Sequence, residues 1–139
     1  MVSDCLIERD GRILLVKASY RDFWQLPGGH AEVGETPYQT AAREVLEEVG
    51  SGIRVEQLLV LNIETDTQGQ AETFCFLFKG TYDGHTPIML QVDELAEFAW
   101  VPFNEALTRL HSLTRMLMPY AQQALDDECT IYLEAGQKR

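Results

Sequence analysis

The sequence has no long hydrophobic run, few cysteines and little positive charge. No apolar stretch approaches the roughly 20 residues of a membrane-spanning helix, and no signal-peptide pattern opens the chain. Cys5, Cys75 and Cys129 form no CxxC pair. This odd count without metal-ligand spacing favours reduced, buried thiols. We therefore expect a cytoplasmic protein with no membrane partner.

Acidic residues outnumber basic ones two to one. There are 22 Asp and Glu against 11 Lys and Arg, which gives a net charge of -11 at pH 7. Such a charge argues against nucleic-acid polymers and anionic membranes as partners. Residues 30–50 alone hold five glutamates and one arginine. A phosphate-rich ligand could approach them only after metal ions neutralise that charge.

The length and composition predict a single globular domain over residues 1–139. Of these 139 residues, 45% are apolar and 24% charged, which is ordinary for a folded domain with a real core. Hydrophobic patterns predict an α/β fold, with a mixed sheet between helical layers. We expect strands near 5–7 and 13–16 around an Asp10-Gly11 hairpin, then 23–26, 53–64, 71–82, 97–101 and 129–133, helices at 104–110 and 112–125, and a frayed tail at 134–139.

A further helix is predicted between Thr36 and Gly50. Thr36 is a candidate N-cap, Pro37 suits the first helical position, and Gln39 completes a capping box. Gly50 is expected to end the helix in a left-handed conformation. At about 100 degrees per residue, two faces separate. The face expected to pack on the sheet holds Tyr38, Ala41, Ala42, Val45, Leu46 and Val49; the other holds Thr40, Arg43, Glu44, Glu47 and Glu48.

Three glutamates on the polar face follow an unfavourable pattern. Glu44, Glu47 and Glu48 are spaced i, i+3 and i+4, where like charges repel by a few tenths of a kcal/mol per pair. The last two also lie in the final turn, where the helix dipole favours cations. Carboxylates that converge on a rigid helix suit a hard divalent cation. Taken alone, the helix leaves an acidic solvent-exposed face open as the alternative.

The residues around this helix resemble the Nudix box. Gly29, five residues, Glu35, seven residues and then Arg43-Glu44-Val45-Leu46-Glu47-Glu48-Val49-Gly50 match the signature at every fixed position. Ser51 replaces the usual final aliphatic residue. A Trp24-Gln25-Leu26-Pro27-Gly28-Gly29 run extends the resemblance upstream. The resemblance implies a Nudix-type α/β/α sandwich with a mixed central sheet.

The resemblance also implies an activity and a site. Nudix enzymes hydrolyse a nucleoside diphosphate linked to another moiety, with Mg²⁺ or Mn²⁺ as cofactor. Carried over to this chain, the metal ligands would be Glu44, Glu47, Glu48 and the carbonyl of Gly29. Arg43 would hold a carboxylate, either Glu35 or Glu48. We thus expect Glu48, Glu44, Arg43 and Glu35 to form the catalytic set, with the general base left open among Glu48 and Glu44 in the box and Glu94 and Glu97 outside it.

The substrate is less determined by the residues. Where ADP-ribose-type members often carry a proline after the box, this chain has Asp66, which favours a (d)NTP cleaved to (d)NMP and pyrophosphate. An ADP-ribose or nucleotide-sugar hydrolase, a non-hydrolytic nucleotide sensor and a structural protein with an acidic helix are the alternatives. Tyr20, Phe23 and Trp24 could stack on a base or be buried. Many members are homodimers, so a homodimer is a further expectation.

Overall fold

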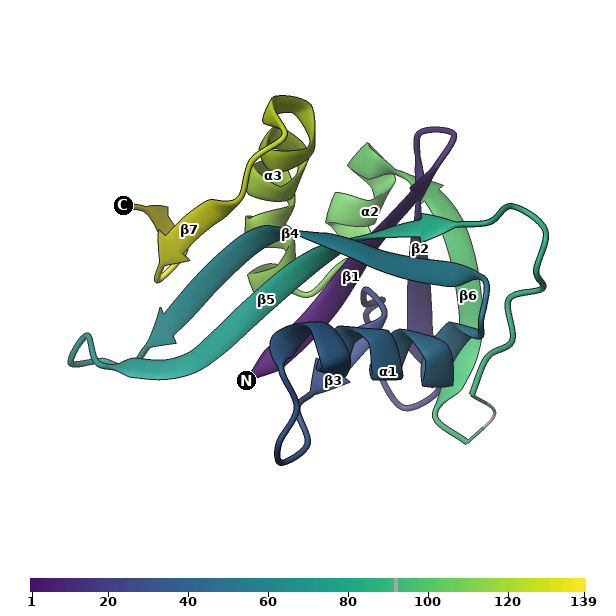
Figure 1. Ribbon diagram of the computed structural model, residues 1–139, viewed down its shortest axis with the longest axis horizontal. Helices are drawn as coiled ribbons and strands as arrows, with labels where there is room; N and C mark the ends of the chain where they lie inside the picture. The colour runs from purple at the N-terminus through teal and green to yellow at the C-terminus, as the bar shows by residue number, and fades with distance from the viewer. Residues whose placement is uncertain (92) are drawn as a thin grey trace.

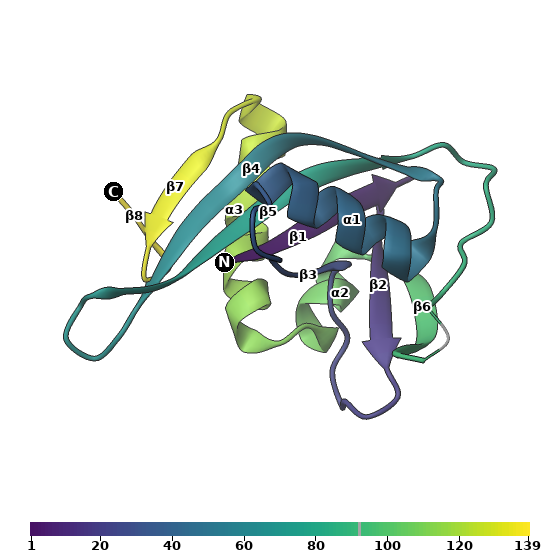
Figure 2. The ribbon, with the colours of Figure 1, turned by 60° about the horizontal axis from the view of Figure 1, so that its bottom comes forward.

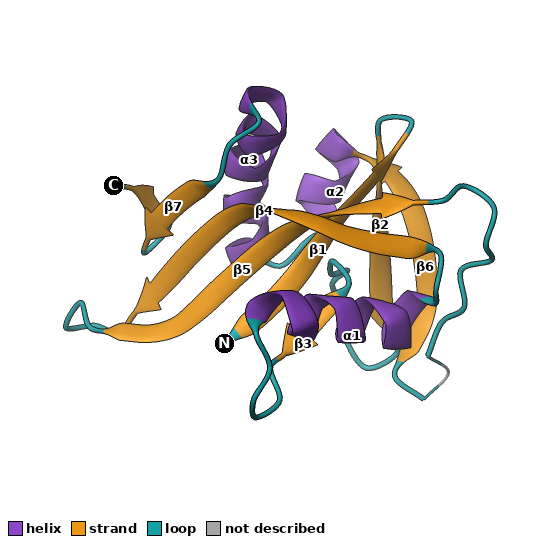
Figure 3. Ribbon diagram, viewed as in Figure 1, coloured by secondary structure: helices purple, strands orange, loops and turns teal. Residues whose placement is uncertain are grey.

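A computed structural model describes residues 1–91 and 93–139 (Figure 1). Strands and helices alternate along the chain, as Figure 3 shows by colour. The strands are β1 (Val2–Arg9), β2 (Arg12–Ala18), β3 (Gly28–His30), β4 (Ile53–Thr65), β5 (Ala71–Tyr82), β6 (Leu95–Pro102), β7 (Ile131–Glu134) and β8 (Gln137–Lys138). The helices are α1 (Pro37–Val49), α2 (Phe103–Arg109) and α3 (Ser112–Asp127).

The strands form one mixed sheet between two helical layers. The strand order is β6-β2-β1-β5-β4-β7-β8, and β3 pairs with the N-terminal half of β1. The β1–β5 and β4–β7 pairs are parallel, whereas β4 and β5 form a long antiparallel hairpin. Helix α1 lies on one side of the sheet and α2 and α3 on the other (Figure 2). This arrangement confirms the predicted α/β/α sandwich.

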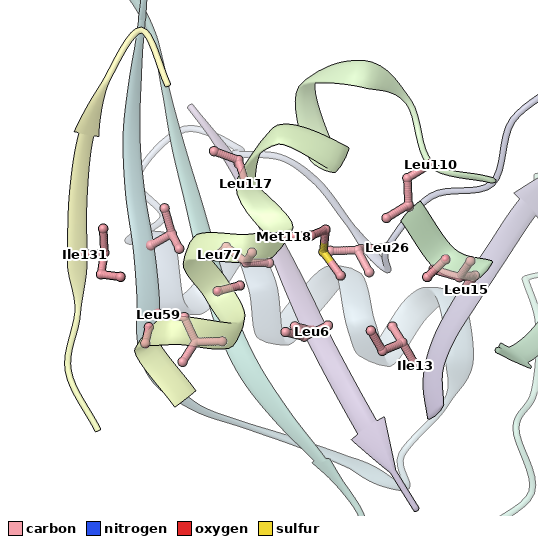
Figure 4. Packing of buried hydrophobic residues seen from close by; sticks show 14 of the residues in the cluster. Leu6, Ile13, Leu15, Leu26, Leu59, Leu77, Leu110, Leu117, Met118 and Ile131 are labelled. Carbon is pink, nitrogen blue, oxygen red and sulfur yellow. The ribbon is translucent and has the colours of Figure 1, made fainter. Parts of the chain in front are cut away.

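Alternate residues of β1 supply two separate cores. Leu6 points into the core under α2 and α3, together with Leu77 and Met118 (Figure 4). Cys5 and Ile7 point the other way, into the core under α1. Successive side chains of a strand point to opposite faces, so a central strand covered on both sides must be apolar on both.

The first hairpin forms where the sequence predicts it, but the short strand at 23–26 does not. Asp10 and Gly11 have φ values of 53° and 75°, as a two-residue turn of the I′ type requires. Trp24 and Gln25 make only single bridges, and the strand forms instead at Gly28–His30. A Cβ added at Gly28 would lie 2.2 Å from Oδ1 of Asp4, so this close pairing with β1 needs glycine.

The buried face of α1 is rotated from the one predicted. The capping box of Thr36 and Gln39 is present, with Pro37 at the first helical position. Leu46, expected to be buried, is 58% exposed, and Tyr38 is also exposed. Thr40 and Glu48 are buried in their place. The helix contacts β3 as well as β1 and β4, which turns its contact face toward the residues next to β3.

The end of α1 also differs in conformation from the prediction. Gly50 has a positive φ of 98° but an extended ψ of -169°, outside the left-handed helical region. The last carbonyl groups of α1 accept hydrogen bonds from the segment before β6, so they do not need a left-handed cap. The N–H of Met89 donates to the carbonyl of Val49 at 3.0 Å, and that of Gln91 to Glu48 at 3.2 Å.

The strand predicted at 129–133 forms as β7, but residues 134–139 are ordered rather than frayed. Ile131 and Leu133 are buried, and β7 pairs with β4. A tight turn at Ala135 and Gly136, with φ values of 51° and 74°, leads into β8. The polar residues after Leu133 are ordered because this turn pairs β8 with β7.

One smaller prediction also fails. Of the three free cysteines only Cys5 is buried, since Cys75 is half-buried and Cys129 is exposed. In α3, Leu113 of the first turn is exposed, whereas Leu117 and Met118 are buried. Pro119 lies inside α3 without ending it. Among the described residues, the helices are too short or too polar to cross a lipid bilayer.

The buried C-terminal strand generates a stability prediction. Leu133→Ala should lower the free energy of unfolding by about 2–5 kcal/mol, because Leu133 is 0% exposed and its truncation leaves a cavity. The neighbouring Tyr132 is 41% exposed, so Tyr132→Ala should cost less than about 1 kcal/mol. Urea unfolding of both variants measures the difference. Equal, small losses would contradict the docking of β7.

Candidate active site

A cleft of about 890 Å³ opens where α1, β1 and β3 meet. Gly28 and Gly29 of β3 lie at one end of it, with Asp4 of β1 and with Glu44 and Glu48 of α1. The cleft then continues along the sheet toward β4 and β5 and toward the first turns of α3. Residues of the predicted site thus share one cleft with surfaces from distant parts of the chain.

Gly29 brings the chain backbone against Glu44. A Cβ added at Gly29 would lie 2.6 Å from Cδ of Glu44 and 2.7 Å from its Oε1, closer than any side chain tolerates. Glycine at this position therefore lets the main chain and the carboxylate approach one another. This is the contact expected if the carbonyl of Gly29 and the carboxylate of Glu44 serve one ligand.

Arg43 is the positive centre of the site. Its Nε and Nη2 donate to the two carboxylate oxygens of Glu35 at 2.7 and 3.0 Å. Its Nη1 donates to Glu44 at 2.9 Å and to Glu47 at 3.3 Å, and Nη2 also reaches the carbonyl of His30 at 3.0 Å. The guanidinium thus ties the acidic loop before α1 to the helix itself, through a bidentate pair.

Glu35 is the carboxylate that Arg43 holds most closely, which decides between the two partners left open by the sequence. The hydroxyl of Thr40 and the backbone N–H of Glu32 donate to Oε1 of Glu35 at 3.0 and 2.8 Å. These bonds, with the one from Arg43 as the largest cause, lower the pKa of Glu35 to about 2. Glu35 therefore stays ionised and fixed.

Glu48 lies in a different environment from the other box glutamates. It is only 4% exposed, and its Oε1 accepts the N–H of Gly28 at 3.4 Å. Its Oε2 is buried without a hydrogen-bond partner among residues 1–91 and 93–139. Burial, followed by the neighbouring carboxylate of Glu44, raises the pKa of Glu48 to about 9. An orphaned buried oxygen is costly unless a proton or a cation satisfies it.

Asp4 joins this group, although the sequence analysis did not select it. It pairs with Gly28 across the β1–β3 ladder and lines the cleft beside Glu44 and Glu48. Burial and the charge of Glu44 raise the pKa of Asp4 to about 7. The only signal in the sequence is that this aspartate directly precedes the apolar run at residues 5–7.

The donor set fits a hard divalent cation. As the side chains stand, the described part of the chain holds no group of three His, Cys, Asp or Glu residues arranged around a metal position. Glu44 and Glu47 form ion pairs with Arg43, whereas Glu48 is buried beside Gly28. Carboxylate and carbonyl oxygens are nevertheless the ligands that Mg²⁺ and Mn²⁺ prefer. The partnerless Oε2 of Glu48 is an oxygen that such an ion would satisfy.

The remaining candidates divide between the cleft and the outer surface. Glu94 lines the cleft, but Glu97 lies on β6, where it pairs across the ladder with Lys17. Tyr20 and Phe23 also line the cleft. Trp24 instead lies against the end of α2, where its backbone N–H donates to the carbonyl of Arg109 at 3.0 Å. The cleft therefore excludes Glu97 and Trp24 from its wall.

Comparison with known proteins gives a consistent result. The NUDIX domain model matches residues 2–121. The putative mutator protein MutT4 of Mycobacterium tuberculosis (strain CDC 1551 / Oshkosh) is 35% identical over 126 residues, which cover 86% of this chain and 46% of that protein. An ADP-ribose pyrophosphatase of Methanocaldococcus jannaschii is 35% identical over 78 residues, covering 54% of this chain and 46% of that protein.

Solved structures share the fold over nearly the whole chain. The crystal structure of a UDP-X diphosphatase superimposes with a TM-score of 0.71 and 26% identity, covering 96% of this chain and 66% of that one. A structure from Nitrosomonas europaea gives a TM-score of 0.73 at 23% identity, which supports the fold alone. The chain spans less than half the length of the curated relatives that it matches first, with 37% and 46% covered.

The buried Glu48 predicts how stability depends on pH without metal. In the folded protein, burial raises the pKa of Glu48 to about 9 and that of Asp4 to about 7, above their ordinary values of 4.5 and 3.8. Stability should therefore fall as pH rises through this range. Glu48→Gln should reduce the dependence, with Asp4 supplying the rest, and Glu47→Gln, at an exposed position, should leave it unchanged. Thermal unfolding in chelator from pH 5 to 9 measures this, and parallel curves for all three proteins would contradict it.

The Arg43 network generates a second prediction. Lysine cannot form the bidentate pair with Glu35, so Arg43→Lys should lower the free energy of unfolding by about 1–3 kcal/mol. Arg54→Lys is the matched control, since Arg54 makes only an exposed ion pair, and should change it by less than about 1 kcal/mol. Urea unfolding of Arg43→Lys, Glu35→Gln and the double variant gives the coupling energy. Strict additivity would show that the pair contributes nothing.

Proposed function

Since the chain belongs to the Nudix family, we propose that it is a divalent-metal-dependent pyrophosphohydrolase that cleaves a nucleoside diphosphate derivative. We propose a (d)NTP as the substrate, released as (d)NMP and pyrophosphate. The observation that carries the proposal is the buried, partnerless carboxylate oxygen of Glu48 beside the Gly28–Gly29 backbone. Asp66, at the position where ADP-ribose-type members often carry a proline, supports the choice of substrate.

In this proposal Glu44, Glu47, Glu48 and the carbonyl of Gly29 hold Mg²⁺ or Mn²⁺. When bound, the ion would neutralise phosphate charge and lower the pKa of an attacking water. Arg43 orients Glu44 and Glu47 through its Nη1, and Glu35 fixes Arg43 in turn. Glycine at these two positions lets the β3 backbone lie directly against Asp4 and Glu44, which brings the carbonyl of Gly29 next to the carboxylate of Glu44.

The proton acceptor is a separate assignment. Glu44, Glu48 and Glu94 line the cleft, whereas Glu97 does not, so we propose that one of these three accepts the proton of the attacking water. Glu48 is buried at the catalytic end, and Glu94 is exposed on the segment before β6. A carboxylate can act in this role only within hydrogen-bond reach of the water.

An ADP-ribose hydrolase is the second candidate, favoured by the 35% identity with the ADP-ribose pyrophosphatase of M. jannaschii. The retention of every box glutamate speaks against a sensor module that binds without cleaving. Three free thiols agree with action in the reducing cytoplasm, which we propose as its location.

A nucleotide panel tests the proposed function. Purified protein with Mg²⁺ or Mn²⁺ should convert at least one (d)NTP to (d)NMP and pyrophosphate, with the products separated by chromatography. Glu48→Gln should fold normally and lose at least about a hundredfold in turnover, because it removes an anionic ligand. Tyr132→Gln, at a surface position away from the cleft, serves as the control. Cleavage of ADP-ribose alone would favour the second candidate, and full activity of Glu48→Gln would overturn the assigned role.

A further inference from the structure

The cleft extends beyond the catalytic end along one face of the sheet. The same face that carries the core under α3 continues as Val2 of β1, Cys75 of β5 and Asn62 of β4, which are neighbours in register. Beyond the first turn of α3 this face is open, and these residues line the cleft. Glu64, two residues after Asn62, lies on the same face at the far end.

The strand register sets the distance between the two ends of the cleft. Asp4 pairs with Gly28 at the catalytic end, and Glu64 pairs with Thr73 on the other side of the Cys75 position. The separation is four residues along the strands, about 13 Å, and two strands across, about 10 Å. The strand register places Cys75 between the two ends, and burial, with the charges of Asp4 and Glu64, raises the pKa of its thiol to about 11. The cleft therefore continues well beyond the end where Gly28 and Gly29 lie.

A buried amide fixes the carboxylate of Glu64. Asn62 is 1% exposed, and its Nδ2 donates to Oε1 of Glu64 at 2.6 Å. Its Oδ1 accepts the backbone N–H of Gly136 at 3.0 Å. Because a backbone N–H can only donate, this bond fixes the amide orientation and leaves its NH₂ group facing Glu64.

The C-terminal hairpin provides the support for Asn62. The turn at Ala135 and Gly136 is held to β4 by the N–H of Ala135, which donates to Ile63 at 2.8 Å. Gly136 also packs so closely on α3 that an added Cβ would lie 2.4 Å from Sδ of Met116. Ala135 and Gly136 lie after residues 2–121, the segment that the family model matches, whereas Asn62 lies within it.

The chemistry of Glu64 selects its ligand. An ionised carboxylate only accepts hydrogen bonds, and Asn62 uses one of its oxygens, which leaves Oε2 and a lone pair of Oε1 free for donors. Building on the proposed function, we propose that Glu64 determines nucleoside specificity by accepting two adjacent hydrogen bonds from the substrate. Such a donor pair occurs on the N1–H and 2-amino edge of guanine and on the 2′,3′-diol of ribose. Asn62 is the positioning residue for this contact.

Equilibrium binding of nucleoside monophosphates tests the proposal without requiring turnover. The constants for GMP, IMP and dGMP are measured by calorimetry with the wild type and with Glu64→Gln. Hydrogen bonds to a charged group contribute enough that Glu64→Gln should weaken GMP binding about tenfold or more. In the wild type, weaker binding of IMP identifies the base edge as the donor pair, and weaker binding of dGMP identifies the sugar diol.

Matched variants separate specificity from stability. Glu56→Gln removes a carboxylate from the same strand outside the cleft and should leave GMP binding unchanged. Asn62→Asp keeps the acceptor for Gly136 but loses the donor to Glu64, so it should reduce the wild-type discrimination between GMP and its analogue toward one. A change in melting temperature alone would not alter this ratio.

The outcomes distinguish this inference from the proposed function. GMP affinity within twofold of wild type in Glu64→Gln, or no measurable GMP binding by the wild type, would overturn the role of Glu64. Nucleotide hydrolysis with a KM that does not respond to Glu64→Gln would reject this inference and keep the proposed function. Binding that depends on Glu64 without any hydrolysis would reject the proposed function alone.

Discussion

The site depends on one guanidinium that is shared among carboxylates. Arg43 forms a bidentate pair with Glu35 and also donates to Glu44, Glu47 and the carbonyl of His30. These bonds close the loop between β3 and α1 onto the helix. Because residues 30–50 hold five glutamates and only one arginine, the region keeps a large excess of negative charge. Divalent cations would balance that excess, and only then could a diphosphate, which is itself anionic, approach.

Glycine allows the backbone of β3 to lie against these carboxylates. At Gly28 and Gly29 the backbone of β3 passes against Asp4 and Glu44 at distances that leave no room for a Cβ. The same packing places Glu48 under Gly28 and removes it from water. The protein therefore stores an unfavourable feature, a buried carboxyl with an unsatisfied oxygen, where a ligand would relieve it. Strained or unsatisfied groups of this kind concentrate at functional sites.

The sheet connects this end of the cleft to surfaces from the rest of the chain. Strands β1, β5 and β4 lie side by side, so their register carries the cleft from Asp4 past Cys75 to Glu64. The C-terminal hairpin supports the far end from behind, because the N–H of Gly136 donates to Oδ1 of Asn62. Residues from both termini thus meet on one face of the sheet, and the box supplies only one part of the cleft.

Local features could be predicted from the residues alone: the capping box at Thr36 and Gln39, the turn at Asp10 and Gly11, and the mixed α/β architecture. These depend on contacts between near neighbours and on periodicity, which the chain carries directly. Long-range packing determines that Leu46 is exposed, that Glu48 is buried, that Asp4 lines the cleft, and that the C-terminal hairpin supports Asn62. Those features arise from packing between segments far apart in sequence, and no local pattern encodes the direction from which a distant strand arrives.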